Sequence, residues 1–271
     1  MKMRPLPRAL SCLLLLVLLP ACASNRAIQE LRADPAWTAF SVAAPLPAAG
    51  WARGRAEVVH IYIEGDGVAY STRTTPSPDP TPITPTALLL ARRDTAPAAA
   101  YLGRPCQYVT GDACSRECWT TGRFSATVLL GMNALMDAAM RQTGARRAVL
   151  IGFSGGGAVA ALLAEERTDV AALVTVCGNL DPAVWTAMHG VTPLHGSLNP
   201  ADRAERLSSL PQTHFLGEKD ANITRRVTDS FVSRLKPGAP VAVRVEPGLG
   251  HGGEAWAEAW PALLAGARLA D

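Results

Sequence analysis

One segment near the middle of this 271-residue chain, Ala148–Glu166, restricts the fold more than any other. It begins with an apolar run of the size of a buried strand, Ala148–Phe153, and ends in an Ala/Leu-rich stretch typical of a helix. Between them, residues 152–156 match the pattern G-x-S-x-G. A strand that turns directly into a helix holds its central residue at positive φ, and glycines two residues away remove clashing side chains. We therefore predict a strand–turn–helix unit that projects Ser154 from the turn.

This geometry makes Ser154 a candidate nucleophile, whereas the alternative is a glycine-rich turn with a buried serine. The amide of Gly155, at the start of the predicted helix, could donate to a developing oxyanion. A second donor is expected in the glycine-rich loop after the β-branched strand Glu57–Ile63. We expect that donor to be the amide of Gly65 or Asp66, unless the loop is a plain turn.

Strands and helices alternate from Val58 to the end, which predicts an α/β fold with a parallel sheet and helices on both faces. Functional groups in such sheets gather at the carboxyl ends of strands. Ser154, Asp220 and His251 each follow a predicted strand. Asp181 also follows one and is the alternative acid, but the tight Gly-x-x-Asp turn favours Asp220. We therefore expect Ser154, Asp220 and His251 to converge.

The motifs GFSGGG, GEKD and GLGHGG, each after a strand, resemble those of the α/β-hydrolase superfamily over roughly residues 57–265. The segments IYIEGDG, YLGRPCQY and GNLDPAVW…HGSLNP resemble uncharacterised exported members from proteobacteria. The resemblance implies a mostly parallel twisted sheet with a small insertion after the fourth or fifth core strand. It also implies that Ser154 attacks an acyl carbonyl, His251 transfers the proton, and Asp220 orients the imidazole. It requires no cofactor and no metal.

The resemblance leaves the activity open between classes. We expect a serine hydrolase, most simply an esterase acting on small to medium acyl esters. A peptidase or amidase of the same fold is the alternative chemistry, since the leaving group is selected by the pocket. A non-catalytic envelope lipoprotein that uses the fold as a binding scaffold is the alternative of another class.

The amino-terminal residues carry export signals. Basic residues precede an apolar core, Leu10–Leu19, that is too short for a membrane span. The following Leu-Pro-Ala-Cys, residues 19–22, resembles the lipobox of bacterial lipoproteins and implies acylation of Cys22. We expect an outer-membrane lipoprotein that faces the periplasm. The alternative is an ordinary signal peptide, cut after Ala21 or Ala23, and a soluble secreted protein.

We divide the chain into a signal peptide at 1–21, a loosely structured lead-in at 22–55, and an α/β-hydrolase domain at 56–271. In the lead-in we expect an edge strand at 37–43 and a turn region at 45–54. The insertion at about 181–210 is a candidate lid. Its residues expected to contact substrate are Trp185, His189 and His195.

The cysteines support export. Apart from Cys12 and Cys22, the chain has four, namely Cys106, Cys114, Cys118 and Cys177. In an oxidising compartment they suggest two disulfides, with three connectivities open. We prefer Cys106–Cys114, which closes one loop, and Cys118–Cys177, which ties that loop to a strand. No Cys/His pair at matching spacing accompanies Cys114-x3-Cys118, so we expect no zinc site.

Composition restricts the partners. The chain is 48% hydrophobic and 18% charged, and part of its net charge of +3 lies in the signal segment. No basic stripe with interleaved aromatic residues is present, so we expect no nucleic-acid partner. We expect a monomer whose partners are a small acyl substrate and, through the lipid anchor, a membrane.

Overall fold

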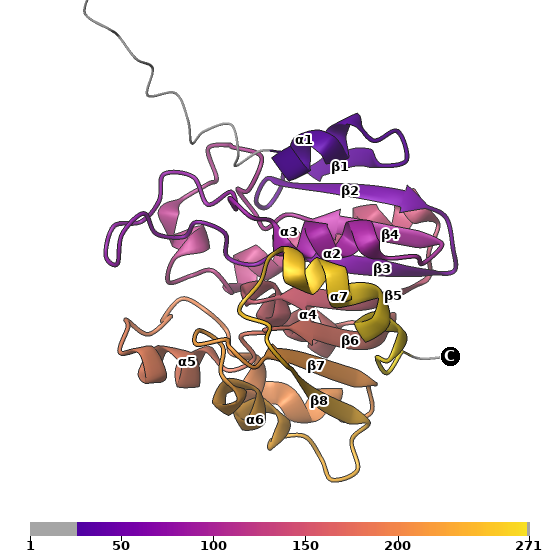
Figure 1. Cartoon of the computed structure of the whole chain (residues 1–271). Helices are drawn as coiled ribbons and strands as arrows, with labels where there is room; N and C mark the ends of the chain where they lie inside the picture. The colour runs from indigo at the N-terminus through magenta and orange to yellow at the C-terminus, as the bar shows by residue number, and fades with distance from the viewer. Residues whose placement is uncertain (1–25, 270–271) are drawn as a thin grey trace, which may run out of the picture.

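Eight strands pair into one sheet in the order β1-β2-β4-β3-β5-β6-β7-β8 in the computed structural model, which describes residues 26–269 (Figure 1). The strands are β1 (Thr38–Val42), β2 (Ala48–Gly54), β3 (Val58–Ile63), β4 (Ala98–Leu102), β5 (Arg147–Phe153), β6 (Val170–Val176), β7 (Gln212–Gly217) and β8 (Val241–Glu246). The pairs β1–β2 and β2–β4 are antiparallel, and all other pairs are parallel. The expected α/β-hydrolase fold is therefore confirmed.

Helices cover both faces of the sheet, because the strand side chains that point to one face and those that point to the other are both largely apolar. They are α1 (Arg26–Ala33), α2 (Thr86–Arg93), η1 (Arg116–Trp119), α3 (Ala126–Thr143), α4 (Gly155–Glu166), α5 (Pro182–His189), η2 (Pro200–Leu207), α6 (Arg225–Val232) and α7 (Glu254–Ala265). Ile61 belongs to the core cluster that includes residues of α3, α4 and η2, whereas its neighbour Tyr62 belongs to the cluster on the opposite face, which includes residues of α1, α2 and α7. In Figure 1, α2 and α7 lie side by side over one face.

The central strands explain the apolar runs of the sequence. All seven residues of β6 are buried, as expected for a parallel strand covered on both sides. The longest helix of the described residues is α3, and its ends follow the capping rules. Ser125 accepts a hydrogen bond from the amide of Val128 at the start, and Gly144 adopts the left-handed conformation at the end. Met132 and Met136 lie in the core.

The amino-terminal part of the sheet is where the sequence-based prediction was wrong. The expected turn at 45–54 contains β2, which pairs with both β1 and β4, and α1 precedes them. Alanines and glycines have little intrinsic strand preference, so packing decides here. The ring of Phe40 covers Gly50, where an added Cβ would lie 2.6 Å from it, and Trp51 stacks on Tyr101.

The expected signal peptide and Cys22 lie outside the described residues. Among residues 26–269, no helix is both long and apolar enough to cross a membrane.

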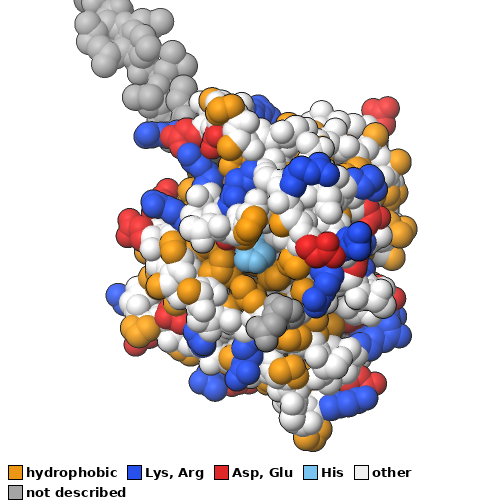
Figure 2. Space-filling model, turned by 90° about the vertical axis from the view of Figure 1, so that its right-hand side faces the viewer, with side chains coloured by type: hydrophobic (Ala, Val, Ile, Leu, Met, Phe, Trp, Pro, Cys, Tyr) orange, Lys and Arg blue, Asp and Glu red, His pale blue; other side chains and the backbone are white. Residues whose placement is uncertain are grey.

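Figure 2 views the side of the molecule at the right of Figure 1. On this face acidic and basic side chains are interspersed around a hollow bordered by hydrophobic side chains.

The disulfide prediction was half right. Cys106 and Cys114 are bonded, as expected. The second expected bond is wrong, because Cys118 and Cys177 are both free thiols. Cys118 packs in a small cluster with Trp119, whereas Cys177 follows β6 and its Sγ lies 3.7 Å from the carbonyl of Gly250.

Candidate active site

The turn between β5 and α4 has the strained geometry that its sequence predicts. Ser154 has φ 51° and ψ −121°. A Cβ on Gly152 would lie 2.3 Å from the carbonyl oxygen of Gly156, and one on Gly156 would lie 2.2 Å from that of Ile63. Side chains at these two positions would push α4 away from the strands, which is why the turn needs both glycines.

The structure brings Ser154, His251 and Asp220 together, although 97 residues separate the first two. His251 Nε2 lies 3.0 Å from Ser154 Oγ, and His251 Nδ1 lies 2.8 Å from Asp220 Oδ2. With the proton on Nδ1 donated to Asp220, Nε2 is free to accept the serine proton. The arrangement has the connectivity of a nucleophile, a base and an orienting acid.

Asp220 is held as an anion. Its Oδ1 accepts the amides of Asn222 at 2.8 Å and Ile223 at 2.9 Å. Burial acts to raise the pKa of Asp220, but the hydrogen bonds from His251 and the Ile223 amide outweigh it, so the pKa lies below its ordinary value. The carboxylate therefore remains charged and fixes the imidazole.

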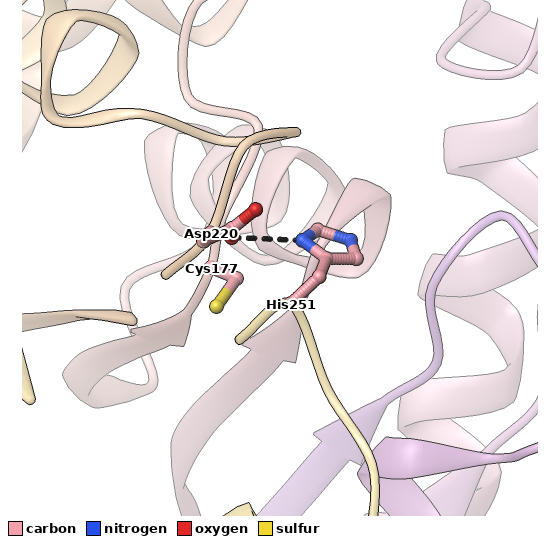
Figure 3. Close-up of side chains that lie close together, drawn as sticks. All are labelled: Cys177, Asp220 and His251. Atoms are coloured by element: carbon pink, nitrogen blue, oxygen red, sulfur yellow. Dashed lines mark hydrogen bonds and ion pairs between the residues drawn. The ribbon is translucent and has the colours of Figure 1, made fainter. Parts of the chain in front are cut away.

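The thiol of Cys177, which we predicted to form a disulfide, lies beside Asp220 and His251. Figure 3 shows Cys177 next to Asp220, which faces His251 across a hydrogen bond. Cys177 has φ 50°, and burial raises the pKa of its thiol far above the ordinary value. The donor atoms of the three residues lie within 4.8 Å of one another. Metal binding would require a thiolate and would break the Asp220–His251 hydrogen bond, so the donor chemistry favours a support of the triad over a metal site.

In the loop after β3, the amide of Asp66 is free to donate within the described part of the chain, whereas the amide of Gly65 is not. The amide of Gly65 donates to Glu64 Oε1 at 2.9 Å, and the Gly65 carbonyl accepts from Gln107 Nε2 at 3.0 Å. In a trans peptide the next N–H points the opposite way from that carbonyl. Within residues 26–269, the amides of Asp66 and Gly155 have no hydrogen-bond partner. Of the two expected donors, the geometry therefore favours Asp66 over Gly65.

Glu64 is a buried carboxyl that braces this loop. Besides the Gly65 amide, it accepts a hydrogen bond from the hydroxyl of Tyr101 at 3.0 Å. Burial raises the pKa of Glu64 to about 7, although its hydrogen bonds act in the opposite direction.

Asp66 itself forms a cluster with two arginines that the sequence analysis missed. Arg123 Nη1 lies 2.6 Å from Asp66 Oδ2, and Arg104 Nη1 lies 3.2 Å from Asp66 Oδ1. Burial acts to raise the pKa of Asp66, but the two guanidinium groups outweigh it and lower the pKa. Both arginines belong to the segment between β4 and α3, so no local pattern announces their contact with residue 66.

Asn222 is a third residue near the site that was not predicted from the sequence. Its Nδ2 lies 3.1 Å from His251 Nε2, and its Oδ1 accepts from Trp185 Nε1 at 3.1 Å. The backbone carbonyl oxygen of Asn222 lies 2.8 Å from His189 Nε2. Two residues after Asp220, it connects the triad with α5. Its place two positions after a predicted acid was the one signal available.

The insertion contributes only part of what was expected of it. Trp185 lines the cavity above Ser154, and His189 reaches the site through Asn222. His195 does not: it is exposed and borders a separate hollow. The helix α5 ends at Gly190, and farther along the insertion Leu198 donates its amide to the carbonyl of Phe124.

The alternative acid, Asp181, and two further histidines, His60 and His214, make contacts that stabilise the fold and do not reach Ser154. Asp181 caps α5 by accepting the Val184 amide and bonds to Ser230 Oγ at 2.6 Å. His60 lies within β3, away from Ser154, and its Nδ1 is 2.6 Å from Asp94 Oδ2. His214 is fully buried, and burial lowers its pKa to about 3.

A cavity of about 880 Å³ opens over the serine. Its wall includes the triad face of Ser154 and His251, the charged pair Asp66 and Arg123, and the ring of Trp185. This volume fits a small to medium organic substrate.

Comparisons with known proteins agree with this geometry. A family model described as the alpha/beta hydrolase fold matches residues 104–208. A search of curated proteins found no match. Many solved structures are similar, among them three of 12–14% identity, a level of likeness that shows the fold alone.

The first is an alpha-beta serine hydrolase homologue from Coxiella burnetii (14% identity, TM-score 0.54, covering 84% of this chain and 95% of that one). The second is the Pyrococcus furiosus esterase Pf2001 (14%, 0.58, 84% and 90%). The third is XC6422 from Xanthomonas campestris, a serine hydrolase without a lid (12%, 0.54, 84% and 94%). The family model and the arrangement of the sheet together show that this chain has the α/β-hydrolase fold.

Proposed function

We propose that this protein is a serine hydrolase that works through an acyl-enzyme. The observation that carries the proposal is the continuous hydrogen-bonded line from Ser154 Oγ through His251 to Asp220, at 3.0 and 2.8 Å. The strained turn exposes the serine, and the free amides of Gly155 and Asp66 lie on the two loops that flank it.

The reaction follows from these positions. His251 Nε2 accepts the Ser154 proton as Oγ attacks the acyl carbonyl, and Asp220 stabilises the imidazolium that forms. The amides of Gly155 and Asp66 donate to the oxyanion, where losing one donor typically costs about 3 kcal/mol. His251 then protonates the leaving group, and water hydrolyses the acyl-enzyme by the same route.

We further propose that the substrates are esters of small to medium acyl groups. The cavity of about 880 Å³ has room for such groups, and an esterase is among the similar solved structures. The peptidase or amidase alternative uses the same triad, so only substrates can separate the two.

The test is a rate comparison between p-nitrophenyl esters of graded chain length and aminoacyl anilides. We expect turnover of short and medium esters, faster than of any anilide, and loss of at least a thousandfold in Ser154→Ala. Ser209→Ala, at an exposed serine without a hydrogen-bonded side chain in the described structure, is the matched control. Faster anilide turnover would favour the peptidase alternative, and folded wild type inactive on both would favour the binding scaffold.

For its location, we propose an outer-membrane lipoprotein anchored through Cys22 and facing the periplasm. The Cys106–Cys114 disulfide supports an oxidising compartment. Metabolic labelling with palmitate should mark the wild type and not Cys22→Ala. Equal labelling of both, or of neither, would favour the soluble secreted form.

A further inference from the structure

We propose that Arg123, together with Arg104 and Asp66, forms an anion-binding subsite in the cavity, so that the preferred substrates are esters carrying a carboxylate. The inference rests on the proposed hydrolase function and names the substrate class of the same site. Nothing in the triad itself selects a charged substrate, so any such selection comes from this cluster.

The cluster has an excess positive charge. Two guanidinium groups share the single carboxylate of Asp66, and the side chains of Arg104 and Arg123 are only 5% and 8% exposed. One arginine would neutralise Asp66, so the second charge is buried without a partner of its own. Burying an unpaired charge is costly, and an anionic substrate group would bring the cluster to neutrality.

Arg123 has hydrogen-bonding capacity left. Its Nε donates to the carbonyl of Thr120 at 2.6 Å and its Nη1 to Asp66. No partner of Nη2 occurs within residues 26–269, and Arg123 is part of the cavity wall. A planar guanidinium fixed by two hydrogen bonds holds its remaining N–H groups in a set direction, which suits a carboxylate.

Neighbouring groups fix the cluster further. Arg104 Nη2 donates to the carbonyl of Arg123 itself, and the ring of Tyr70 lies 6.0 Å from the guanidinium carbon of Arg123. These contacts leave Arg123 little freedom to turn away, so the subsite exists before substrate arrives.

The subsite adjoins the reacting centre. A Cβ on Gly155 would lie 2.0 Å from Asp66 Oδ1, so the carboxylate rests directly on the residue after the nucleophile. Arg123 is bonded to the other oxygen of that carboxylate. A substrate carboxylate at Arg123 is therefore a short chain away from a carbonyl at Ser154.

The other carboxyl facing the cavity does not cancel this charge. Glu64 belongs to the cavity wall, but burial raises its pKa to about 7, so near neutral pH it carries only part of a negative charge. It is also bonded to the Gly65 amide and to Tyr101 rather than to either arginine.

The experiment compares monomethyl adipate with methyl hexanoate, which have the same ester and the same chain length but differ in the terminal carboxylate. Wild-type kcat/KM for each is measured by acid release at constant pH. Binding of each to Ser154→Ala is measured by NMR titration, which needs no turnover. We expect the anionic ester to be favoured at least tenfold in both measurements. Equal values, or a preference for the neutral ester, would overturn the inference.

The same experiment on variants uses the ratio of kcat/KM for the two esters. A general effect on the triad changes both values alike and so cancels in this ratio. Arg123→Gln should bring the ratio close to one, whereas Arg141→Gln, at an exposed arginine in the last turn of α3, should keep the wild-type ratio. An unchanged ratio in folded Arg123→Gln would overturn the inference. If that variant does not fold, Arg123→Lys and the wild-type ratio decide.

The two proposals can fail separately. Hydrolysis of both esters with no preference for the anionic one keeps the hydrolase and refutes the subsite. Tighter binding of monomethyl adipate to Ser154→Ala, with no hydrolysis by wild type, supports the subsite and refutes the hydrolase.

Discussion

At the scale of single residues, Ser154 occupies a backbone conformation that most side chains avoid. Its φ of 51° lies in the region where a residue with a Cβ is strained by roughly 1–3 kcal/mol. Such strain is tolerated where the surrounding packing imposes it and function requires it. Here the packing of Gly156 against β3 imposes it.

Replacing this serine by glycine should therefore stabilise the protein while abolishing hydrolysis. We expect Ser154→Gly to have a free energy of unfolding about 1 kcal/mol above that of Ser154→Ala, because glycine adopts positive φ without a Cβ clash. Urea unfolding monitored by tryptophan fluorescence measures the difference. A less stable glycine variant would show that the turn is relaxed.

Glu64 should make stability depend on pH. Its pKa rises from 4.5 to about 7 on folding, so the folded state keeps a proton that the unfolded state loses. The resulting stabilisation is fully present below pH 4.5 and is lost as pH rises through 7. Between pH 4.5 and 8, the unfolding free energy of wild type should fall by about 3 kcal/mol more than that of Glu64→Gln.

The measurement is urea unfolding of both proteins at the two pH values. Glu258→Gln, at an exposed position of α7, serves as the matched control and should follow wild type. Parallel pH curves for wild type and Glu64→Gln would show that the carboxyl titrates as in water.

At the scale of elements, the segment between β4 and α3 acts as a support for the loop after β3. Gln107 holds the Gly65 carbonyl and so turns the Asp66 amide away from it. We expect Gln107→Leu to lower kcat about tenfold with a smaller change in KM, because a misplaced donor weakens transition-state binding more than substrate binding. Steady-state kinetics on a p-nitrophenyl ester measures both, with exposed Gln142→Leu as the control. A change confined to KM would contradict the positioning role.

The helix α5 acts as one wall of the cavity. Trp185 is fixed there by its hydrogen bond to Asn222. We expect Trp185→Ala to raise KM about tenfold and to change kcat less, since it removes a large apolar contact surface from the substrate. His195→Ala should behave as wild type, because His195 borders a different hollow. If His195→Ala had the larger effect, the segment after α5 would have to move over the site.

At the scale of the whole molecule, the carboxyl edge of the sheet could be predicted because each of its loops carries a local signature. The glycines around Ser154, the tight turn before Asp220 and the glycine-rich loop around His251 all follow strands with clear apolar patterns. A parallel sheet then places strand ends together without further information.

What could not be predicted depends on contacts between distant segments. β2 is a strand because β1 and β4 flank it, not because Ala and Gly favour strands. Arg123 meets Asp66 across 57 positions, and nothing near either residue indicates the pair. Cys177 was assigned to a disulfide because four cysteines in an oxidising compartment suggested two bonds, but its position at the end of β6 puts it beside Asp220.

The central claim is that Ser154 is an activated nucleophile, and covalent labelling tests it most directly. Folded wild type is treated with a fluorophosphonate, digested, and mapped by mass spectrometry. The account predicts one phosphonylated peptide, modified at Ser154, with labelling abolished in Ser154→Ala and strongly slowed in His251→Ala. An unlabelled wild type, or a label on another serine that persists in Ser154→Ala, would contradict it.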